Sequence, residues 1–267
     1  MDEILHEMHV WMHAYMRSYH TDDADVMLGI RLKEIHTGYV TANARALARH
    51  LGCTPHDTAL AEIIGLFHDV GRFRQYAVYQ TFNDAQSEDH AELGLKVIAE
   101  HDLLRGLSAA DAELVRFAIK YHNKKEIPAC DDRRKIFFAK LIRDADKLDI
   151  YRVLLPFLSP DGADKAPKFV PSDAAQEVSP DFIADFAAGR QADYYRLRTH
   201  GDRKIVRLMW IYDINFVWTL RRIKSRGYID AFIESLPPQA GIAEGVARMR
   251  AYVARRCGEE DKMELYG

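Results

Sequence analysis

The stretch that decides the fold is GLFHDVGRF, residues 65–73. It ends an apolar run with helical spacing, formed by Leu60, Ile63, Ile64 and Phe67, which predicts a helix that faces the core. This helix places His68 and Asp69 in the interior, where charged side chains need partners. A hydrogen bond between the two residues or a metal ion can meet that need. We favour the metal because histidines and aspartates recur in similar positions on other predicted helices.

Two further histidines lie on apolar faces of predicted helices. A helix over about residues 25–51 places His36 in one buried stripe of residues three or four apart. Another helix, which Ser87 is expected to cap, carries His90 on an apolar face. Gly94 lies one turn beyond His90, where its missing side chain allows a neighbouring helix to approach closely.

The next two predicted helices supply His122 and Asp146. The capping-box pattern SAAD at residues 108–111 opens a helix whose apolar stripe ends at His122. A long helix over about residues 133–158 has an apolar stripe that Asp146 interrupts, and a carboxylate in that setting needs a cation. Three charged neighbours on this helix can face elsewhere: Arg143, Asp144 and Lys147.

Residues 73–86, FRQYAVYQTFNDAQ, mix aromatic and polar side chains without clean periodicity. We therefore expect an irregular crossing near the mouth of the site. Its four aromatic side chains can form a lid over that site.

The chain beyond about residue 158 predicts a helical extension. Prolines and the turn sequence SPDG make residues 159–181 a connection. Further helices are expected at about residues 181–188, 191–200, 202–226, 228–235 and 240–257. With no internal repeat and no β-alternation, the prediction is an all-α single domain over residues 1–267. Its helical-bundle core covers about residues 28–158, and additional C-terminal helices cover about residues 181–257.

Composition limits the partners and the compartment. The formal net charge of −3 over 267 residues gives no basic field of the kind that attracts nucleic-acid polymers. The three cysteines, Cys53, Cys130 and Cys257, are far apart and indicate neither a disulfide framework nor a thiolate zinc site. The sequence begins without a signal peptide and has no uninterrupted apolar run long enough for a membrane span. We expect a cytoplasmic protein with no membrane contact, and homo-oligomerisation stays open.

Six inward side chains form the candidate metal ligands: His36, His68, Asp69, His90, His122 and Asp146. Each comes from a separate predicted helix except the adjacent pair. Four imidazoles and two carboxylates suit two first-row divalent metal ions, such as iron, manganese, cobalt or zinc. Asp69 is well placed to bridge them, and a single metal would leave ligands unused.

The order H…HD…H…H…D, with HDVGRF, DHAELG and RDADKLD around its members, resembles the HD superfamily of metal-dependent phosphohydrolases. The resemblance covers about residues 28–158. It implies that the family's four core ligands are His36, His68, Asp69 and Asp146. It also implies that His90 and His122 are the additional pair found in two-metal members of the family.

Differences from the motifs of known HD branches narrow the class of substrate. Asn-Lys-Lys follows His122, so the GYP signature of the cyclic-di-GMP phosphodiesterases is missing, and the paired acids of the alarmone hydrolases do not follow Asp69. Several relatives have a lysine where this chain has Arg72. A phosphate-contacting role carried to Arg72 keeps its charge but changes its geometry.

These residues predict hydrolysis of a small phosphate ester, such as a nucleotide or a related metabolite. Two divalent ions against two ligand carboxylates leave about two positive charges, which favour a bridging hydroxide and a bound phosphate. Asp69 and Arg72 are the expected catalytic residues, with Arg72 as a phosphate clamp. Lys124 and Lys147 are expected secondary substrate contacts, although each alone also fits a solvated helix surface.

Two other functions stay open at this point. A minority of HD proteins hold mixed-valence di-iron with the same six ligands and insert oxygen into small polyols or phosphonates. Ligand identity does not separate that chemistry from hydrolysis. A metal-stabilised binding module without turnover is disfavoured because all six ligand types are present.

Overall fold

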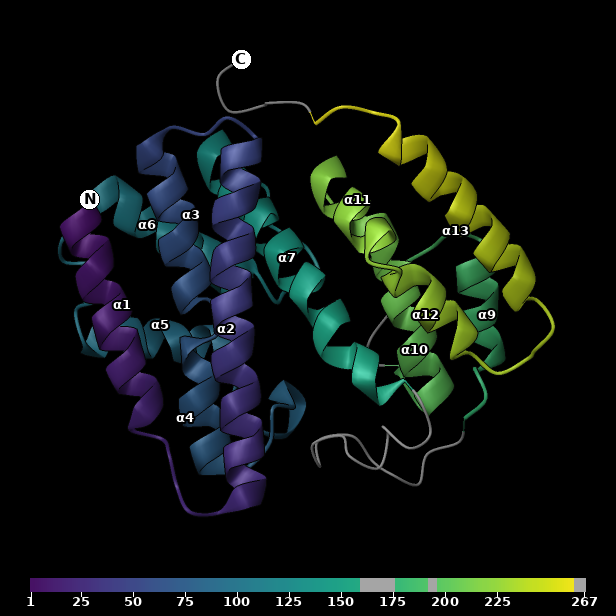
Figure 1. Cartoon of the computed structure of the whole chain (residues 1–267), viewed down its shortest axis with the longest axis horizontal. Coiled ribbons are helices and arrows are strands. Elements are labelled where there is room, and N and C mark those ends of the chain that lie inside the picture. Colours follow the sequence, from purple (N-terminus) through teal and green to yellow (C-terminus); the bar gives the residue numbers. More distant parts are fainter. Residues whose placement is uncertain (159–175, 192–195, 262–267) are drawn as a thin grey trace. The chain divides into compact units, whose positions relative to one another are not determined.

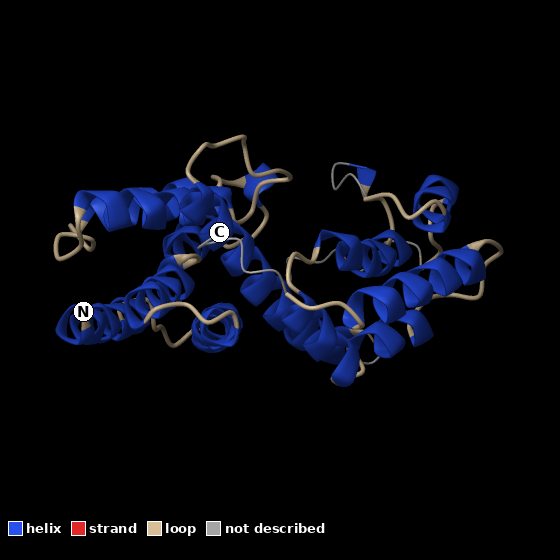
Figure 2. Cartoon of the chain, turned by 90° about the horizontal axis from the view of Figure 1, so that it is seen from above, coloured by secondary structure: helices blue, strands red, loops and turns tan. Residues whose placement is uncertain are grey.

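The structure is a computed structural model that describes residues 1–158, 176–191 and 196–261. Every regular element in these residues is a helix, as Figure 2 shows, which confirms the all-α prediction. The chain divides into two compact units, whose described parts are residues 1–149 and residues 150–158, 176–191 and 196–261. That the whole chain folds as a single domain stays a prediction. None of the helices in the described ranges combines the length and hydropathy needed to cross a bilayer.

The first unit is a helical bundle (Figure 1), and one of its helices is buried over most of its length. Its elements are α1 (Asp2–Arg17), α2 (Ala24–His50), α3 (Pro55–Phe67), α4 (Val70–Tyr79), η1 (Asp84–Gln86), α5 (His90–Glu100), α6 (Ala109–Tyr121) and α7 (Arg133–Leu154), and the unit boundary falls within α7. Helix α3 packs against α1, α2 and α6. Because it is apolar on nearly all sides, it is buried from Asp57 to Phe67. The core of the unit therefore leads directly into His68.

Local sequence fixes where α3 begins. Thr54 is its N-cap and accepts a hydrogen bond from Asp57 N at 3.1 Å, while Pro55 occupies the first turn, where its missing N–H has no intrahelical partner to lose.

We expect Thr54→Ala to lower the free energy of unfolding by about 1 kcal/mol because the backbone N–H of Asp57 loses its partner. Urea unfolding followed by circular dichroism measures the change. Thr54→Ser keeps the hydroxyl and should stay near the wild-type value; equal losses in both variants would contradict the capping role.

Residues 70–79 form helix α4, so the irregular crossing expected over residues 73–86 is wrong for its first half. Val70, Phe73 and Tyr76 are three residues apart and are buried on one face of the helix. The polar residues between them weakened the periodic signal in the sequence. Phe73 and Tyr76 are therefore part of the core and do not form a lid. In this part of the chain, irregular structure occurs only between Tyr79 and His90, where the short helix η1 interrupts it.

Helices α4 and α5 approach closely at two glycines. A Cβ atom on Gly71 would lie 2.3 Å from the carbonyl oxygen of His90 and 2.5 Å from Gly94 N. The expected close approach at Gly94 is confirmed, although Gly71 is the position that requires it. The N-cap of α5 is Asp89, which corrects the expectation of Ser87. The Asp89 carboxylate accepts from Ala91 N and Glu92 N, which are within its reach at the helix start.

The second unit consists of helices that follow the last turn of α7. They are η2 (Leu155–Phe157), α9 (Pro180–Ala187), α10 (His200–Met209), η4 (Trp210–Asp213), α11 (Val217–Ser225), α12 (Tyr228–Glu234) and α13 (Ile242–Cys257). Tyr151 in the last turn of α7 packs against residues of η4 and α12. The Tyr151 ring is fully buried, lies parallel to Tyr228 at 6.1 Å and meets Phe232 edge-on at 5.5 Å. The additional C-terminal helices are therefore present as expected.

Two expected helices of this unit are wrong. Residues 196–199 precede α10 without forming the α-helix expected over 191–200, and residues 192–195 and most of the expected connection lie outside the described ranges. The long helix expected over 202–226 is interrupted at Ile214–Phe216. There Asp261 accepts from Val217 N at 2.5 Å and Trp218 N at 3.0 Å, which caps α11. A capping residue more than forty positions away leaves no local signal in the sequence.

Candidate metal centre

The His68–Asp69 pair forms the junction between two helices. Helix α3 ends at Phe67 and α4 begins at Val70, so the pair lies between the two helices. The sequence had suggested that both residues belong to one helix. His68 is the C-cap of α3, and Asp69 is the N-cap of α4 with φ −109° and ψ 15°. Both side chains are buried. The chain turn therefore holds a base and an acid together inside the core.

The two carboxylate oxygens of Asp69 each face a different pair of histidines. Nε2 of His36 lies 3.5 Å from Asp69 Oδ2, and Nε2 of His68 lies 3.6 Å from it. Nε2 of His90 lies 3.4 Å from Asp69 Oδ1, and Nε2 of His122 lies 3.7 Å from it. Two groups of donors thus share one carboxylate.

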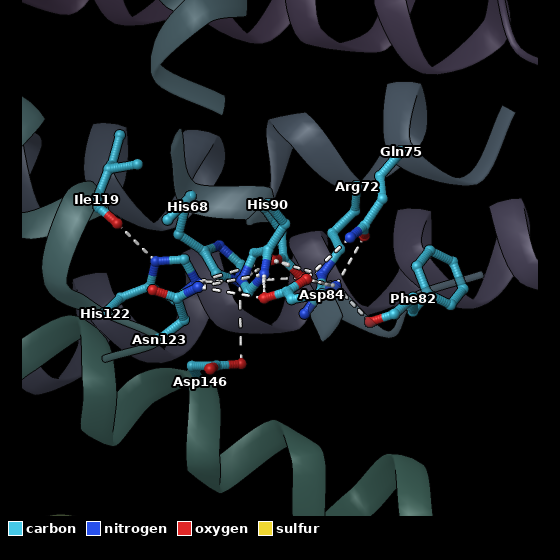
Figure 3. A network of polar contacts seen from close by, with 12 residues as sticks. His68, Arg72, Gln75, Phe82, Asp84, His90, Ile119, His122, Asn123 and Asp146 are labelled. Atoms are coloured by element: carbon cyan, nitrogen blue, oxygen red, sulfur yellow. Dashed lines mark hydrogen bonds and ion pairs between the residues drawn. The ribbon is translucent and has the colours of Figure 1, made fainter. Parts of the chain in front are cut away.

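Asp146 of α7 completes the first group. Its Oδ1 lies 3.1 Å from His36 Nε2 and 3.9 Å from His68 Nε2, and Figure 3 shows it below the histidines. The structure therefore brings all six side chains expected as metal ligands into one cluster. They come from α2, the α3–α4 junction, α5, the end of α6 and α7.

In every histidine of the cluster, the Nδ1 atom of the ring is held by a hydrogen bond to an acceptor outside the donor set. His68 Nδ1 donates to the carbonyl oxygen of Gly65 at 2.8 Å, and His122 Nδ1 donates to that of Ile119 at 2.7 Å. His36 Nδ1 donates to Asp149 Oδ2 at 2.7 Å, and His90 Nδ1 donates to Asp84 Oδ2 at 2.6 Å. These acceptors place the proton on Nδ1 and direct Nε2 toward Asp69.

One consequence is that Nε2 atoms face one another. Nε2 of His90 and Nε2 of His122 are 3.1 Å apart, and because both rings donate from Nδ1, each Nε2 presents a lone pair. Burial, followed by the charge of Arg72, lowers the pKa of His90 to about 3, so this imidazole is neutral at pH 7. Burial also lowers the pKa of His68 to about 4. Two facing lone pairs repel unless a cation lies between them, so this donor set fits a metal ion.

The carboxylates of the cluster are ionised. Burial raises the pKa of Asp69, but the charge of Lys33 and the adjacent His68 hold it well below its ordinary value. Burial likewise raises the pKa of Asp146, and the contact with His36 lowers it below the usual range. Burial and Lys33 lower the pKa of His36, whereas its bonds to Asp146 and Asp149 raise it overall. Carboxylates on both sides of His36 need a positive charge there, from a proton or from a metal.

The region that carries the cluster belongs to a known domain family. Residues 34–151 match the family model of the HD domain. This part of the chain is an HD domain. The match includes all six clustered ligands, begins just before His36 and ends just after Asp149. Searches of the curated proteins and of the solved structures found no match to this chain.

Cations surround the cluster of the HD domain, and sequence reasoning missed one of them. Lys33 Nζ donates to Asp69 Oδ2 at 2.7 Å, and its side chain is largely buried. It lies three residues before His36 on the same helix face, a spacing that could have revealed it. Lys147 is buried beside Asp146, so the alternative of a solvated surface position is wrong for this lysine. Lys124 is half-buried and forms an ion pair with Asp89.

The charged neighbours of Asp146 on α7 are buried as well. Arg143 donates to the carbonyl oxygens of Tyr121 and Lys125, each at 3.3 Å, and Asp144 is fully buried. Helix α7 is therefore buried on more sides than its apolar stripe indicates.

Arg72 is held by three acceptors through one nitrogen. Its Nη1 donates to Phe82 O at 2.7 Å, Gln75 Oε1 at 2.8 Å and Asp84 Oδ1 at 2.9 Å. Its Nη2 takes part in none of the hydrogen bonds found among the described residues. The expected phosphate contact of Arg72 stays a prediction, and Nη2 is the group through which it would act.

Proposed function

We propose that this HD-domain protein is a metal-dependent phosphohydrolase that acts on a small phosphate ester, such as a nucleotide or a related metabolite. HD domains are commonly metal-dependent phosphohydrolases. The observation that carries the proposal is the pair of facing Nε2 atoms of His90 and His122, both neighbours of one Asp69 oxygen. A cation there, and a second one at the other oxygen, would satisfy the whole cluster.

Under this proposal the ligands fall into two groups with a shared member. His36, His68, Asp69 and Asp146 would hold one divalent ion. Asp69, His90 and His122 would hold the other, and iron, manganese, cobalt and zinc all suit this donor set. Such ions lower the pKa of coordinated water and offset negative charge on phosphate oxygens.

The surrounding side chains would bind and orient the phosphate. Lys33 Nζ lies 2.7 Å from Asp69 Oδ2, Lys147 follows Asp146 in the chain, and both side chains are too buried to serve as ordinary surface charges. With two carboxylates against two divalent ions, the centre would keep about two positive charges, which favours an anionic substrate. Arg72 and Lys124 would add contacts at the edge of the site. These charges support a phosphate ester over an uncharged small molecule.

Phosphate release from a substrate panel tests the proposal. Nucleotides, sugar phosphates and cyclic dinucleotides are each incubated with the purified protein, supplied in turn with manganese, cobalt and iron. We expect metal-dependent release of phosphate from at least one class, and its loss on addition of a chelator. Inactivity across the panel with oxygen uptake on a polyol or phosphonate would instead assign the di-iron oxygenase function. Metal retention with neither activity would assign a binding module.

A further inference from the structure

Asp84 links His90 to the first turns of α4. Its Oδ2 accepts from His90 Nδ1, and its Oδ1 accepts from Arg72 Nη1 at 2.9 Å and from Gln75 Nε2 at 2.8 Å (Figure 3). Gln75 is fully buried and also donates to Ser87 Oγ and Glu88 O, each at 2.8 Å. A buried amide and a guanidinium therefore fix the segment that carries Asp84.

We infer that Asp84 is a positioning residue that sets the tautomer and orientation of His90, and that Arg72 and Gln75 act through it. The inference rests on the proposed metal centre, because the orientation matters only if Nε2 of His90 binds a cation. A carboxylate at Nδ1 keeps the proton there and leaves the Nε2 lone pair directed at the Asp69 side. Arg72 would thus serve the metal centre even where it touches no substrate.

The same device recurs on the other side of Asp69. Asp149 accepts from His36 Nδ1 as Asp84 accepts from His90 Nδ1, while His68 and His122 use backbone carbonyl oxygens. Each proposed metal position therefore includes one histidine held by a carboxylate and one held by the main chain. Asp149 provides a matched control, because it should affect only the His36 side.

An asparagine at position 84 separates the role of the carboxylate from its shape. A carboxylate accepts through both oxygens, whereas an amide accepts through one and donates through the other end. In Asp84→Asn the NH2 end of the amide must therefore face either His90 Nδ1 or the donors of Arg72 and Gln75. The first choice moves the His90 proton to Nε2, and the second breaks the support of the segment.

The test combines metal titration with a tautomer measurement. Calorimetric titration with Mn²⁺ should give two ions for the wild type. In Asp84→Asn the ion on the His90 side should bind about 10–100-fold more weakly while the other ion is retained, and Asp149→Asn should show the reverse. In the metal-free protein, ¹⁵N shifts of the ring nitrogens should report loss of the Nδ1–H tautomer at His90 only in Asp84→Asn. Gln75→Leu, which removes an uncharged donor to Asp84 Oδ1 and leaves Asp84 in place, should weaken the same ion to a smaller degree.

The outcomes separate this inference from the proposed function. Unchanged metal affinities and an unchanged His90 tautomer in Asp84→Asn would overturn the positioning role. A wild-type protein that binds no metal would remove the proposed function, and the tautomer measurement would still decide the role of Asp84. Circular dichroism of each variant establishes that it is folded. Should Asp84→Asn fail to fold, the ring-nitrogen shifts of the metal-free wild type decide, because an Nε2–H tautomer at His90 there would overturn the positioning role of Asp84.

Discussion

Asp69→Ala should release both metal ions and abolish turnover. Its Oδ2 lies 3.5 Å from His36 Nε2 and its Oδ1 lies 3.4 Å from His90 Nε2, so one truncation removes a donor from each group. The side chain also partners Lys33, whose ammonium would be left among the histidines as a competing positive charge. We expect phosphate release to fall on the order of 10³-fold or more. Elemental analysis of the purified variant gives the metal content, and the substrate panel gives the activity.

His122→Ala is the matched control for the bridging role. It removes a donor only from the group that faces Asp69 Oδ1, so one ion should be lost and the other retained. His90→Ala removes a donor from the same group and should give the same stoichiometry. Thermal unfolding followed by circular dichroism separates metal loss from misfolding. Phosphate release that persists in Asp69→Ala would indicate a contaminating enzyme. Retention of one ion by Asp69→Ala would show that this carboxylate does not bridge.

Gly71→Ala should destabilise the HD domain and weaken its metal centre together. The new methyl group would lie 2.3 Å from His90 O and 2.5 Å from Gly94 N, and these are backbone atoms that no rotamer change can move. Helices α4 and α5 must separate, which draws His90 away from Asp69 at the start of α4. We expect a loss of about 2–4 kcal/mol in the free energy of unfolding. Urea unfolding and the Mn²⁺ titration measure the two effects.

Gly94→Ala tests whether this effect belongs to position 71. A Cβ atom on Gly94 would lie 3.4 Å from Val70 Cγ1, which is ordinary van der Waals contact, and Gly94 is inside helix α5. Alanine there should be neutral or stabilise by up to about 1 kcal/mol, because it restricts the unfolded chain. A similar loss in both variants would mean that the interface between the helices, and not the backbone contact at Gly71, sets the tolerance.

The fold was predictable where apolar periodicity was strong and local caps were present. Helices α2 and α3 follow from their buried stripes and from Thr54 with Pro55. Helix α4 was not predicted because its apolar residues are only three positions apart. The polar residues Arg72, Arg74 and Gln75 lie between them in the sequence and weaken the periodicity. The break before α11 depends on Asp261, which is distant in sequence and close in space. Long-range capping of this kind has no periodic trace.

The ligand types and their convergence were accessible from the sequence, and their supports were only partly so. His36 and Asp146 stood out because each interrupts an apolar stripe. Lys33 and Asp149 lie three residues from those ligands on the same helices and could have been found by that spacing. Asp84 could not, because it belongs to a segment without periodicity and reaches His90 only through the packing of α4 on α5. Its role depends on tertiary structure.

The two kinds of histidine support differ in how they respond to mutation. The bonds that hold His68 and His122 end on backbone carbonyl oxygens, which no side-chain substitution removes, although a Cβ atom on Gly65 would lie 2.9 Å from Thr41 Cα and would shift the first of them. The bonds of His36 and His90 end on carboxylates, which a single base change can convert to an amide or remove. In the proposed centre, each metal position therefore has one histidine held by the main chain and one whose basicity a side-chain substitution can adjust. Asp149 and Asp84 would let evolution tune the two ions separately while Asp69 keeps them joined.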